Sequence, residues 1–126
     1  MTASARLLPL SERSKCPIAN ALDVVGDRWT LLVVRDLLFF GKVRYKELAA
    51  STERIPTNLL ADRLRRLEAA GIVEKKAYQK RPVRYEYRLT PRGSDLLPLM
   101  REMVTWANLH IAGTARPPAR FYEVGR

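Results

Sequence analysis

The chain has 126 residues, of which 47% are hydrophobic and 29% charged, so it is long enough for one folded domain with a modest core and too short for two. Its formal net charge of +10 favours a polyanionic partner, either a nucleic acid or an anionic membrane surface. The sequence has no run of about 18 apolar residues and only one cysteine, so we expect a cytoplasmic protein without a membrane span or an internal disulfide.

The N-terminal segment predicts an irregular arm followed by a short helix. Residues 1–14 are mostly small and polar, so we expect a flexible arm that becomes ordered only in a dimer. Ile18, Leu22 and Val25 then share one helical face. Gly26 can end this first helix.

Two more helices are predicted before residue 51. Asp27 can cap a helix over about residues 28–39, because its carboxylate can accept the free amides of the first turn. This second helix is apolar on nearly every side and should be the most buried element. After a turn at residues 41–43, residues 44–50 predict a short third helix. Its inward residues are expected to be Tyr45, Leu48 and Ala49, with Arg44 and Lys46 left outside.

The segment from Pro56 to Gly71 predicts a fourth helix with one apolar face and one polar, largely basic face. Pro56 suits a first helical turn, and Gly71 suits the left-handed residue that ends a helix. The preceding connector, residues 51–55, has the length found between the two helices of a helix-turn-helix, so the fourth helix takes the position of a recognition helix. The apolar stripe contains Leu60, Leu64 and Leu67, and the opposite face contains Asn58, Asp62, Arg65, Arg66 and Ala69.

After this helix the apolar period changes to two, which predicts a β-hairpin. We expect strands at residues 72–78 and 84–89, joined by a basic connector at 79–83, with Tyr85, Tyr87 and Leu89 facing the core. Residues 42–88 contain 13 Lys and Arg against 6 Asp and Glu, so most of the net charge lies in this part of the chain. A basic-faced helix followed by a basic-tipped hairpin predicts a winged helix-turn-helix, a fold that is mainly α with a small β-hairpin.

The C-terminal part predicts one long helix and a dimer interface. Thr90 and Pro91 form a start signal, the apolar pattern continues to Ile111, and any kink at Pro98 would fall near the start. The apolar surface is wider than one small domain needs for its own packing, so we expect it to bind a second copy of the chain. The expected interface residues are Leu8, Met100, Met103, Val104 and Trp106.

The predicted organisation therefore has three parts. Residues 1–14 form the flexible arm, and residues 15–112 form the winged helix-turn-helix domain. This domain includes the C-terminal dimerisation helix at about residues 91–112, and residues 113–126 form an irregular tail.

An ordered series of sequence blocks between Cys16 and Trp106 resembles the HxlR family of bacterial winged-helix regulators, a MarR-like group. The blocks are Cys16-Pro17, residues 27–32, 44–48, 60–68, 71–73 and 85–90, Gly93, Leu97-Pro98 and Trp106. The resemblance implies a homodimeric transcriptional regulator, expected to be a repressor, with recognition helices in successive major grooves of a near-palindromic operator and wings on the flanking backbone. Pro56 and Thr57 replace a common serine and a common proline, so the operator sequence of relatives is not transferable.

If the protein binds an operator in this way, its polar and basic side chains fall into two groups, those that contact bases and those that contact the DNA backbone. We expect base contacts from Thr57, Asn58, Ala61 and Arg65, because asparagine suits adenine and arginine suits guanine. Asp62 would be repelled by phosphate unless it contacts a cytosine amine or pairs with a neighbour such as Arg65 or Arg66, and Arg63 is expected to be structural. The backbone and wing candidates are Arg44, Lys46, Arg66, Lys80, Arg81 and Arg84, for which the alternative is ordinary solvated charge.

Cys16 is the only thiol of the chain. In several HxlR-like regulators a cysteine at this position senses oxidants or electrophiles. Nearby Lys15 and Arg13, together with the start of a helix, would stabilise a thiolate here. The alternative role is that of a small packing residue beside the dimer interface. The expected signal is accordingly an oxidant or a small-molecule effector.

Enzyme activity is the least favoured function. The sequence has no Gly-rich phosphate loop, no paired carboxylates with a base, and no nucleophile with a histidine nearby. His110 and Cys16 are too few and too distant to predict a metal site, so we expect no metal and no cofactor. The main alternative to operator binding is a winged-helix module for RNA or protein contact, since this fold hosts several functions.

Overall fold

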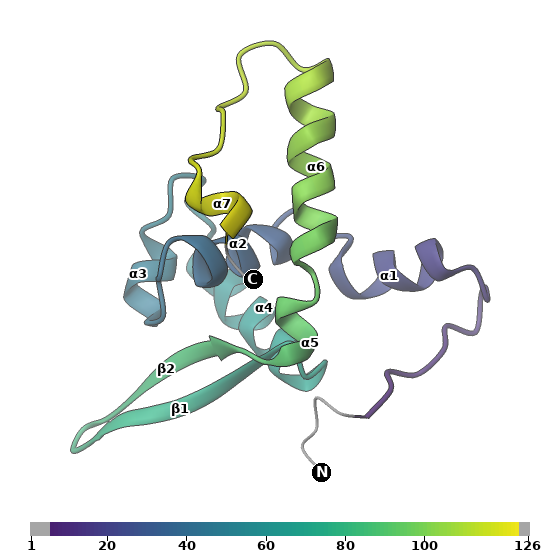
Figure 1. The fold of residues 1–126 in the computed structure, drawn as a ribbon. Helices are drawn as coiled ribbons and strands as arrows, with labels where there is room; N and C mark the ends of the chain where they lie inside the picture. The colour runs from purple at the N-terminus through teal and green to yellow at the C-terminus, as the bar shows by residue number, and fades with distance from the viewer. Residues whose placement is uncertain (1–5, 124–126) are drawn as a thin grey trace.

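The computed structural model describes residues 6–123, so the ends of the predicted arm and tail, at 1–5 and 124–126, lie outside the described residues. Figure 1 shows α2 and α4 near the centre, the hairpin projecting from one side, and α1 held beside the body. The elements are α1 (Pro17–Val25), α2 (Thr30–Phe39), α3 (Tyr45–Ala49), α4 (Thr57–Ala69), β1 (Val73–Lys80), β2 (Val83–Leu89), α5 (Pro91–Ser94), α6 (Leu97–His110) and α7 (Arg120–Glu123). The predicted fold class, mainly helical with one antiparallel hairpin, is confirmed.

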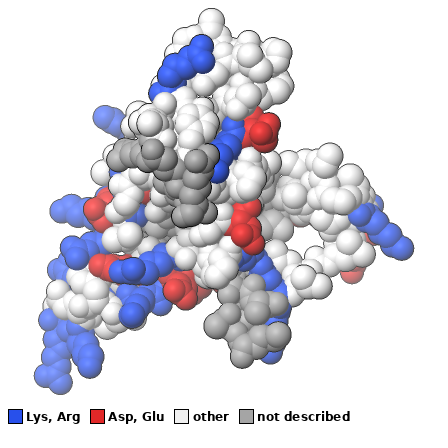
Figure 2. Space-filling view, in the orientation of Figure 1, with Lys and Arg blue, Asp and Glu red and all other residues white. Residues whose placement is uncertain are grey.

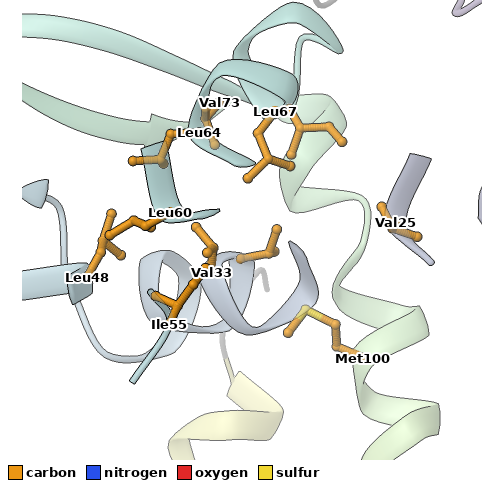
Figure 3. Close-up of a cluster of buried hydrophobic side chains, with 11 residues drawn as sticks. Val25, Val33, Leu48, Ile55, Leu60, Leu64, Leu67, Val73 and Met100 are labelled. Atoms are coloured by element: carbon orange, nitrogen blue, oxygen red, sulfur yellow. The ribbon is translucent and has the colours of Figure 1, made fainter. Parts of the chain in front are cut away.

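The core lies where α2, α3 and α4 meet the root of the hairpin. Leu60, Leu64 and Leu67 of α4 are buried, as the apolar stripe predicted. Figure 3 shows Val33 of α2 and Leu48 of α3 pointing into the same interior. The recognition helix is therefore fixed to the body along one whole face, which leaves its opposite face at the surface.

The ends of α2 and α4 follow from their capping residues. Asp27 accepts the amides of Trp29 and Thr30 at 3.0 and 3.2 Å, as predicted, although the N-cap residue of α2 is Trp29 and the helix begins at Thr30 rather than near residue 28. Gly71 adopts φ 70° after α4. The Ile72 amide donates to the Leu67 carbonyl at 2.9 Å, which closes the helix in a Schellman turn that a left-handed glycine permits.

The sequence predicts Pro56 in the first turn of α4, but the structure places it before that turn. It is the N-cap residue, with an extended ψ of 140°, and α4 begins at Thr57. The fixed φ of proline, here −56°, suits this capping position as well as a helical one, and the carbonyl of Pro56 accepts the Leu60 amide at 2.9 Å. Thr57 is therefore the first residue of the helix.

The hairpin is longer than its apolar pattern indicated. β1 and β2 pair from Val73 with Leu89 at the root to Lys80 with Val83 at the tip. The connector is therefore Arg81-Pro82 rather than residues 79–83. The side-chain amide of Gln79 donates to the carbonyls of both connector residues, at 3.3 and 3.1 Å, and so stabilises the tight turn.

Two tyrosines predicted to face the core are exposed. Tyr85 pairs with Ala77 toward the tip of the hairpin and is exposed, and the Lys75 ammonium lies 4.4 Å from its ring centre. Tyr45 lies at the surface of α3, where its hydroxyl donates to the Thr57 carbonyl at 2.9 Å. In both cases the polar hydroxyl makes exposure inexpensive.

The predicted C-terminal helix is broken in two. Thr90 caps α5 by accepting the Gly93 amide at 3.2 Å, as expected, but α5 ends at Ser94 and α6 starts at Leu97. Pro98 has no N–H to donate to the Ser94 carbonyl, and its ring would clash with that carbonyl in a continuous helix, so the chain breaks before it.

The two terminal segments contact the body more than expected. Described arm residues 6–14 are irregular, yet the Ser11 amide donates to Asn20 Oδ1 at 2.7 Å on α1. The tail, predicted to be irregular, contains α7, whose Phe121 is buried against Phe39 with ring centres 4.7 Å apart. None of the helices within residues 6–123 has the length and apolarity needed to cross a membrane.

Candidate nucleic-acid interface

The outward face of α4 presents the predicted base-contacting side chains. Thr57, Asn58 and Arg65 are exposed, and Ala61 is half-buried beside them. The leucine stripe on the other side of the helix is buried, so these residues cannot turn inward without dismantling the core. The structure thus brings the four residues together on one accessible helix surface.

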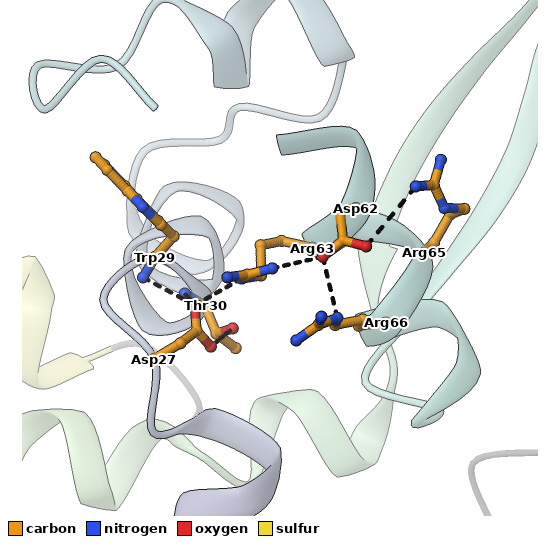
Figure 4. A network of polar contacts seen from close by, with 7 residues as sticks. All are labelled: Asp27, Trp29, Thr30, Asp62, Arg63, Arg65 and Arg66. Carbon is orange, nitrogen blue, oxygen red and sulfur yellow. Dashed lines mark hydrogen bonds and ion pairs between the residues drawn. The ribbon is translucent and has the colours of Figure 1, made fainter. Parts of the chain in front are cut away.

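Asp62 organises the arginines around it, as Figure 4 shows. Its carboxylate lies 3.0 Å from Arg66 Nε and 3.7 Å from Arg65 Nη2, so of the two alternatives considered for Asp62 the structure shows the pairing with its neighbours. It also accepts a hydrogen bond from Arg63. Both outer guanidinium groups remain about 70% exposed, and such pairs are weak enough to be exchanged for a phosphate or a base edge. Asp62 therefore holds the arginines in place without neutralising the whole face.

Asp27 and Arg63 join the start of α2 to the recognition helix. Arg63 Nε donates to Asp27 Oδ2 at 2.7 Å, and both side chains are largely shielded from solvent. Partial burial raises the pKa of Asp27, but hydrogen bonds from Thr30, Arg63 and the Trp29 amide outweigh it and lower the pKa to about 2. Arg63 thus has the structural role expected of it, and the pair fixes α4 relative to α2.

Basic side chains also gather along the hairpin. Lys80, Arg81 and Arg84 are exposed at its far end, where Figure 2 shows Lys and Arg clustered. Lys75 and Lys76 of β1 are exposed as well, and sequence reasoning did not include them among the contacts. Their position in a charged strand of the same hairpin was the signal that could have identified them.

Arg44 and Lys46 behave differently from each other. Lys46 is exposed on α3, as expected. The Arg44 guanidinium instead lies 4.1 Å from the ring centre of Tyr78 and 3.7 Å from Glu86, so it connects α3 to the hairpin while staying half-exposed. A cation over an aromatic face is stabilised by the ring quadrupole, so Arg44 helps to position the wing.

A second polar cluster holds the connector between α3 and α4. Arg35 of α2 donates to both oxygens of Glu53, at 2.7 and 2.8 Å, and this hydrogen bonding lowers the pKa of Glu53 to about 2. The buried Asp36 accepts from the hydroxyl of Ser51. These contacts were not predicted, because residues so far apart in sequence give no local pattern. They anchor the turn that sets the angle of the recognition helix.

The predicted dimer residues are divided between the interior and the surface. Met100 is only 7% exposed and belongs to the core, so its prediction as an interface residue is corrected: it lies on the side of α6 that packs against the body. Met103 and Trp106 are exposed, the latter by 61%, and Val104 is half-buried. Leu8 of the arm is exposed.

Cys16 is exposed at the N-cap of α1. Its carbonyl accepts a hydrogen bond from the Asn20 side-chain amide at 2.9 Å. Arg13, which was expected to act on the thiol, is instead bound to Asp23 at 2.6 Å and to the Ala19 carbonyl at 3.1 Å. The thiol is accessible, whereas Arg13, one of the two cations expected beside it, is directed to another partner.

Helix α3, a short turn, helix α4 and the adjoining two-stranded hairpin define a winged helix-turn-helix protein. The family model of the HxlR-like helix-turn-helix proteins matches residues 24–114. The chain therefore belongs to the HxlR-like family, as the ordered sequence blocks predicted.

Similar proteins support this assignment. The HTH-type transcriptional regulator Rv3095 of Mycobacterium tuberculosis is 37% identical over 103 residues, which cover 82% of this chain and 64% of the relative. This chain thus spans less than two thirds of that protein. The HTH-type transcriptional regulator YodB of Bacillus subtilis is 35% identical over 94 residues, which cover 74% of this chain and 83% of YodB.

Solved structures show the same fold. The reduced form of YodB from B. subtilis superposes with a TM-score of 0.65 at 31% identity, covering 81% of this chain and all of that one. The redox regulator HypR in its reduced form gives a TM-score of 0.67 at 33% identity, covering 77% of this chain and 95% of HypR.

Proposed function

We propose that this protein is a transcriptional regulator that binds a specific double-stranded DNA operator. The observation that carries the proposal is the outward face of α4, where Asn58 and Arg65 are exposed next to a basic hairpin. An α-helix fits the major groove, and these side chains have the donors and acceptors that distinguish adenine and guanine there. The relatives named above are transcriptional regulators, which supports the same function and not an enzymatic one.

In this proposal α4 supplies discrimination and the hairpin supplies affinity. Thr57, Asn58, Ala61 and Arg65 contact bases, and the cationic groups of α3, α4 and the hairpin contact phosphates. The phosphate contacts come from Arg44, Lys46, Arg66, Lys80, Arg81 and Arg84. Since phosphate contacts release bound counterions and base contacts do not, the two groups are separable by their salt dependence.

We further propose that the active form is a homodimer on a near-palindromic operator. Apolar side chains remain exposed on two elements, at Ile18 and Leu22 of α1 and at Met103 and Trp106 of α6. A symmetric pairing of these surfaces, with Leu8 at the margin, would bury them. It would also set two recognition helices about one helical turn, ~34 Å, apart. Repression requires only that the bound dimer occludes a promoter, so a repressor is the simplest regulator of this design.

Cys16 is proposed as the input for an oxidant or electrophile. The thiol is exposed and stands at the start of α1, directly before the exposed apolar residues of that helix. Structures of HypR in oxidised form and of YodB after diamide treatment belong to proteins of this fold, which supports a redox role here. A disulfide to the partner copy or to a small thiol would displace α1 and change the spacing of the recognition helices. If diamide changes operator affinity equally in wild type and Cys16→Ser, Cys16 is not the input.

The proposal is tested by selecting duplexes from a random library and measuring the affinity of the selected duplex by fluorescence anisotropy. A scrambled duplex and a single-stranded RNA of the same length are the controls. We expect the selected duplex to bind about a thousandfold more tightly than the scrambled one. Equal binding of all three would contradict operator recognition and favour an RNA-binding module.

A further inference from the structure

A cavity of about 320 Å³ lies between α2, α6 and the tail. Three aromatic rings line it, those of Phe39 and Phe40 at the end of α2 and that of Phe121 in α7. Leu31, Met100 and Val104 complete most of its wall. Ligand pockets in proteins have volumes from about 300 Å³ upward and are mostly apolar, so the size and lining suit a small molecule.

The tail is held in place as one wall of this cavity. Arg101 of α6 donates to the Phe121 carbonyl at 3.0 and 3.3 Å. Asn108 donates to Thr114 Oγ1 at 2.7 Å and to the Ala115 carbonyl at 3.1 Å. The family match ends at residue 114, so residues 115–121 of this wall lie outside the matched part of the chain.

Two arginines line the cavity, and one of them has no carboxylate partner within residues 6–123. Arg35 and Arg116 are its two charged lining residues. Arg35 is paired with Asp36 at 2.9 Å and with Glu53 at 2.7 Å, so its charge is already balanced. Arg116 is exposed and, within residues 6–123, forms no ion pair. An anionic group of a ligand would find its counter-charge there.

We propose that this cavity binds a small aromatic molecule that carries one anionic group, a site that goes beyond DNA binding. The aromatic part lies among Phe39, Phe40 and Phe121, and the anion lies at Arg116. A volume of about 320 Å³ is too small for a helix or a second protein chain, and its apolar lining with one positive charge matches an aromatic monoanion. The exposed stripe at Trp106 and Leu109 lies on another side of α6 and is not part of the site.

The test uses two fluorescent probes and no DNA, so its result does not depend on the proposed regulatory function. The anionic probe is 1-anilinonaphthalene-8-sulfonate, and the neutral one is N-phenyl-1-naphthylamine. Val104→Trp fills the cavity, Arg116→Gln removes the cation, and Leu109→Ser is the matched control, since it removes an exposed apolar side chain of the same helix outside the cavity.

We expect both probes to bind wild type and Leu109→Ser saturably at one per subunit, and Val104→Trp to abolish this binding. Arg116→Gln should weaken the anionic probe by about threefold, the size of an exposed ion pair, and leave the neutral probe unchanged. If Val104→Trp does not fold, as judged by circular dichroism, Phe121→Ser replaces it and must also reduce the binding of both probes. Undiminished probe binding in the folded cavity variant, or equal effects of Arg116→Gln on both probes, would overturn the proposal.

Discussion

Replacing Asp27 with Asn should destabilise the protein and do so in a pH-dependent way. The carboxylate accepts two amides at the start of α2 and binds Arg63 Nε of the recognition helix at 2.7 Å. An asparagine side chain keeps a capping oxygen but cannot balance the guanidinium. The largely buried charge of Arg63 would then lose one of its two carboxylate partners.

The magnitude follows from the pKa of Asp27. Its fall from 3.8 to about 2 corresponds to about 2.4 kcal/mol at about 1.36 kcal/mol per pH unit. The side chain is 29% exposed, so screening by solvent reduces the expected loss to about 1–2 kcal/mol. Since the folded pKa is lowered, this contribution is complete above about pH 5, falls by about half near pH 3, and is lost below about pH 2.

The assay is urea unfolding followed by circular dichroism, with wild type and Asp27→Asn compared at about pH 7 and about pH 3. Glu53 loses its own stabilising charge over the same pH range, but it does so in both proteins, so the difference between them isolates Asp27. Asp23→Asn is the control, because its pair with Arg13 is solvent-exposed and its loss should leave stability unchanged. A difference that is equal at both pH values, or absent at pH 7, would refute this role.

Three further predictions concern the helix, the core and the connector. Arg65→Ala should cost about 1–3 kcal/mol of binding free energy on the selected duplex alone. Lys80→Ala should weaken binding to all duplexes alike and lower the slope of log affinity against log salt concentration by about 1. Equal losses of Arg65→Ala on selected and random DNA would make Arg65 a backbone contact. Met100→Ala should lower the free energy of unfolding by about 2–5 kcal/mol, while Trp106→Ser should weaken the dimer in sedimentation and leave subunit stability intact. Ser51→Ala should cost about 1–3 kcal/mol in urea unfolding, because the buried Asp36 loses a donor, and an unchanged midpoint would contradict that.

Local sequence periodicity predicts the buried residues correctly where they recur once per helical turn. Leu60, Leu64 and Leu67 are spaced so that one face of α4 must be buried, and Gly71 marks the only kind of residue that closes the helix without strain. The same reasoning identified the exposed face of the recognition helix, because it is the complement of the buried one.

Periodicity failed where a neighbouring element decides burial. Met100 and Trp106 are both apolar residues of the same helix, yet Met100 belongs to the core cluster, whereas Trp106 stays 61% exposed beside the His110 ring. Tyr85 has the alternation of a core-facing residue, but it lies toward the tip of the hairpin and is exposed. The burial of Phe121 was not predicted, because the residue follows a segment of turn-forming residues. Its burial depends on Phe39, which is distant in sequence.

In the proposed complex, two recognition helices of a dimer read one operator. Hydroxyl-radical footprinting of the protein on its selected duplex tests it most directly, with Arg65→Ala measured beside wild type. We expect two symmetric protected regions about one helical turn, ~34 Å, apart, and neither region with Arg65→Ala at the same protein concentration. A single protected region, or a uniform pattern that the substitution leaves unchanged, would contradict the account.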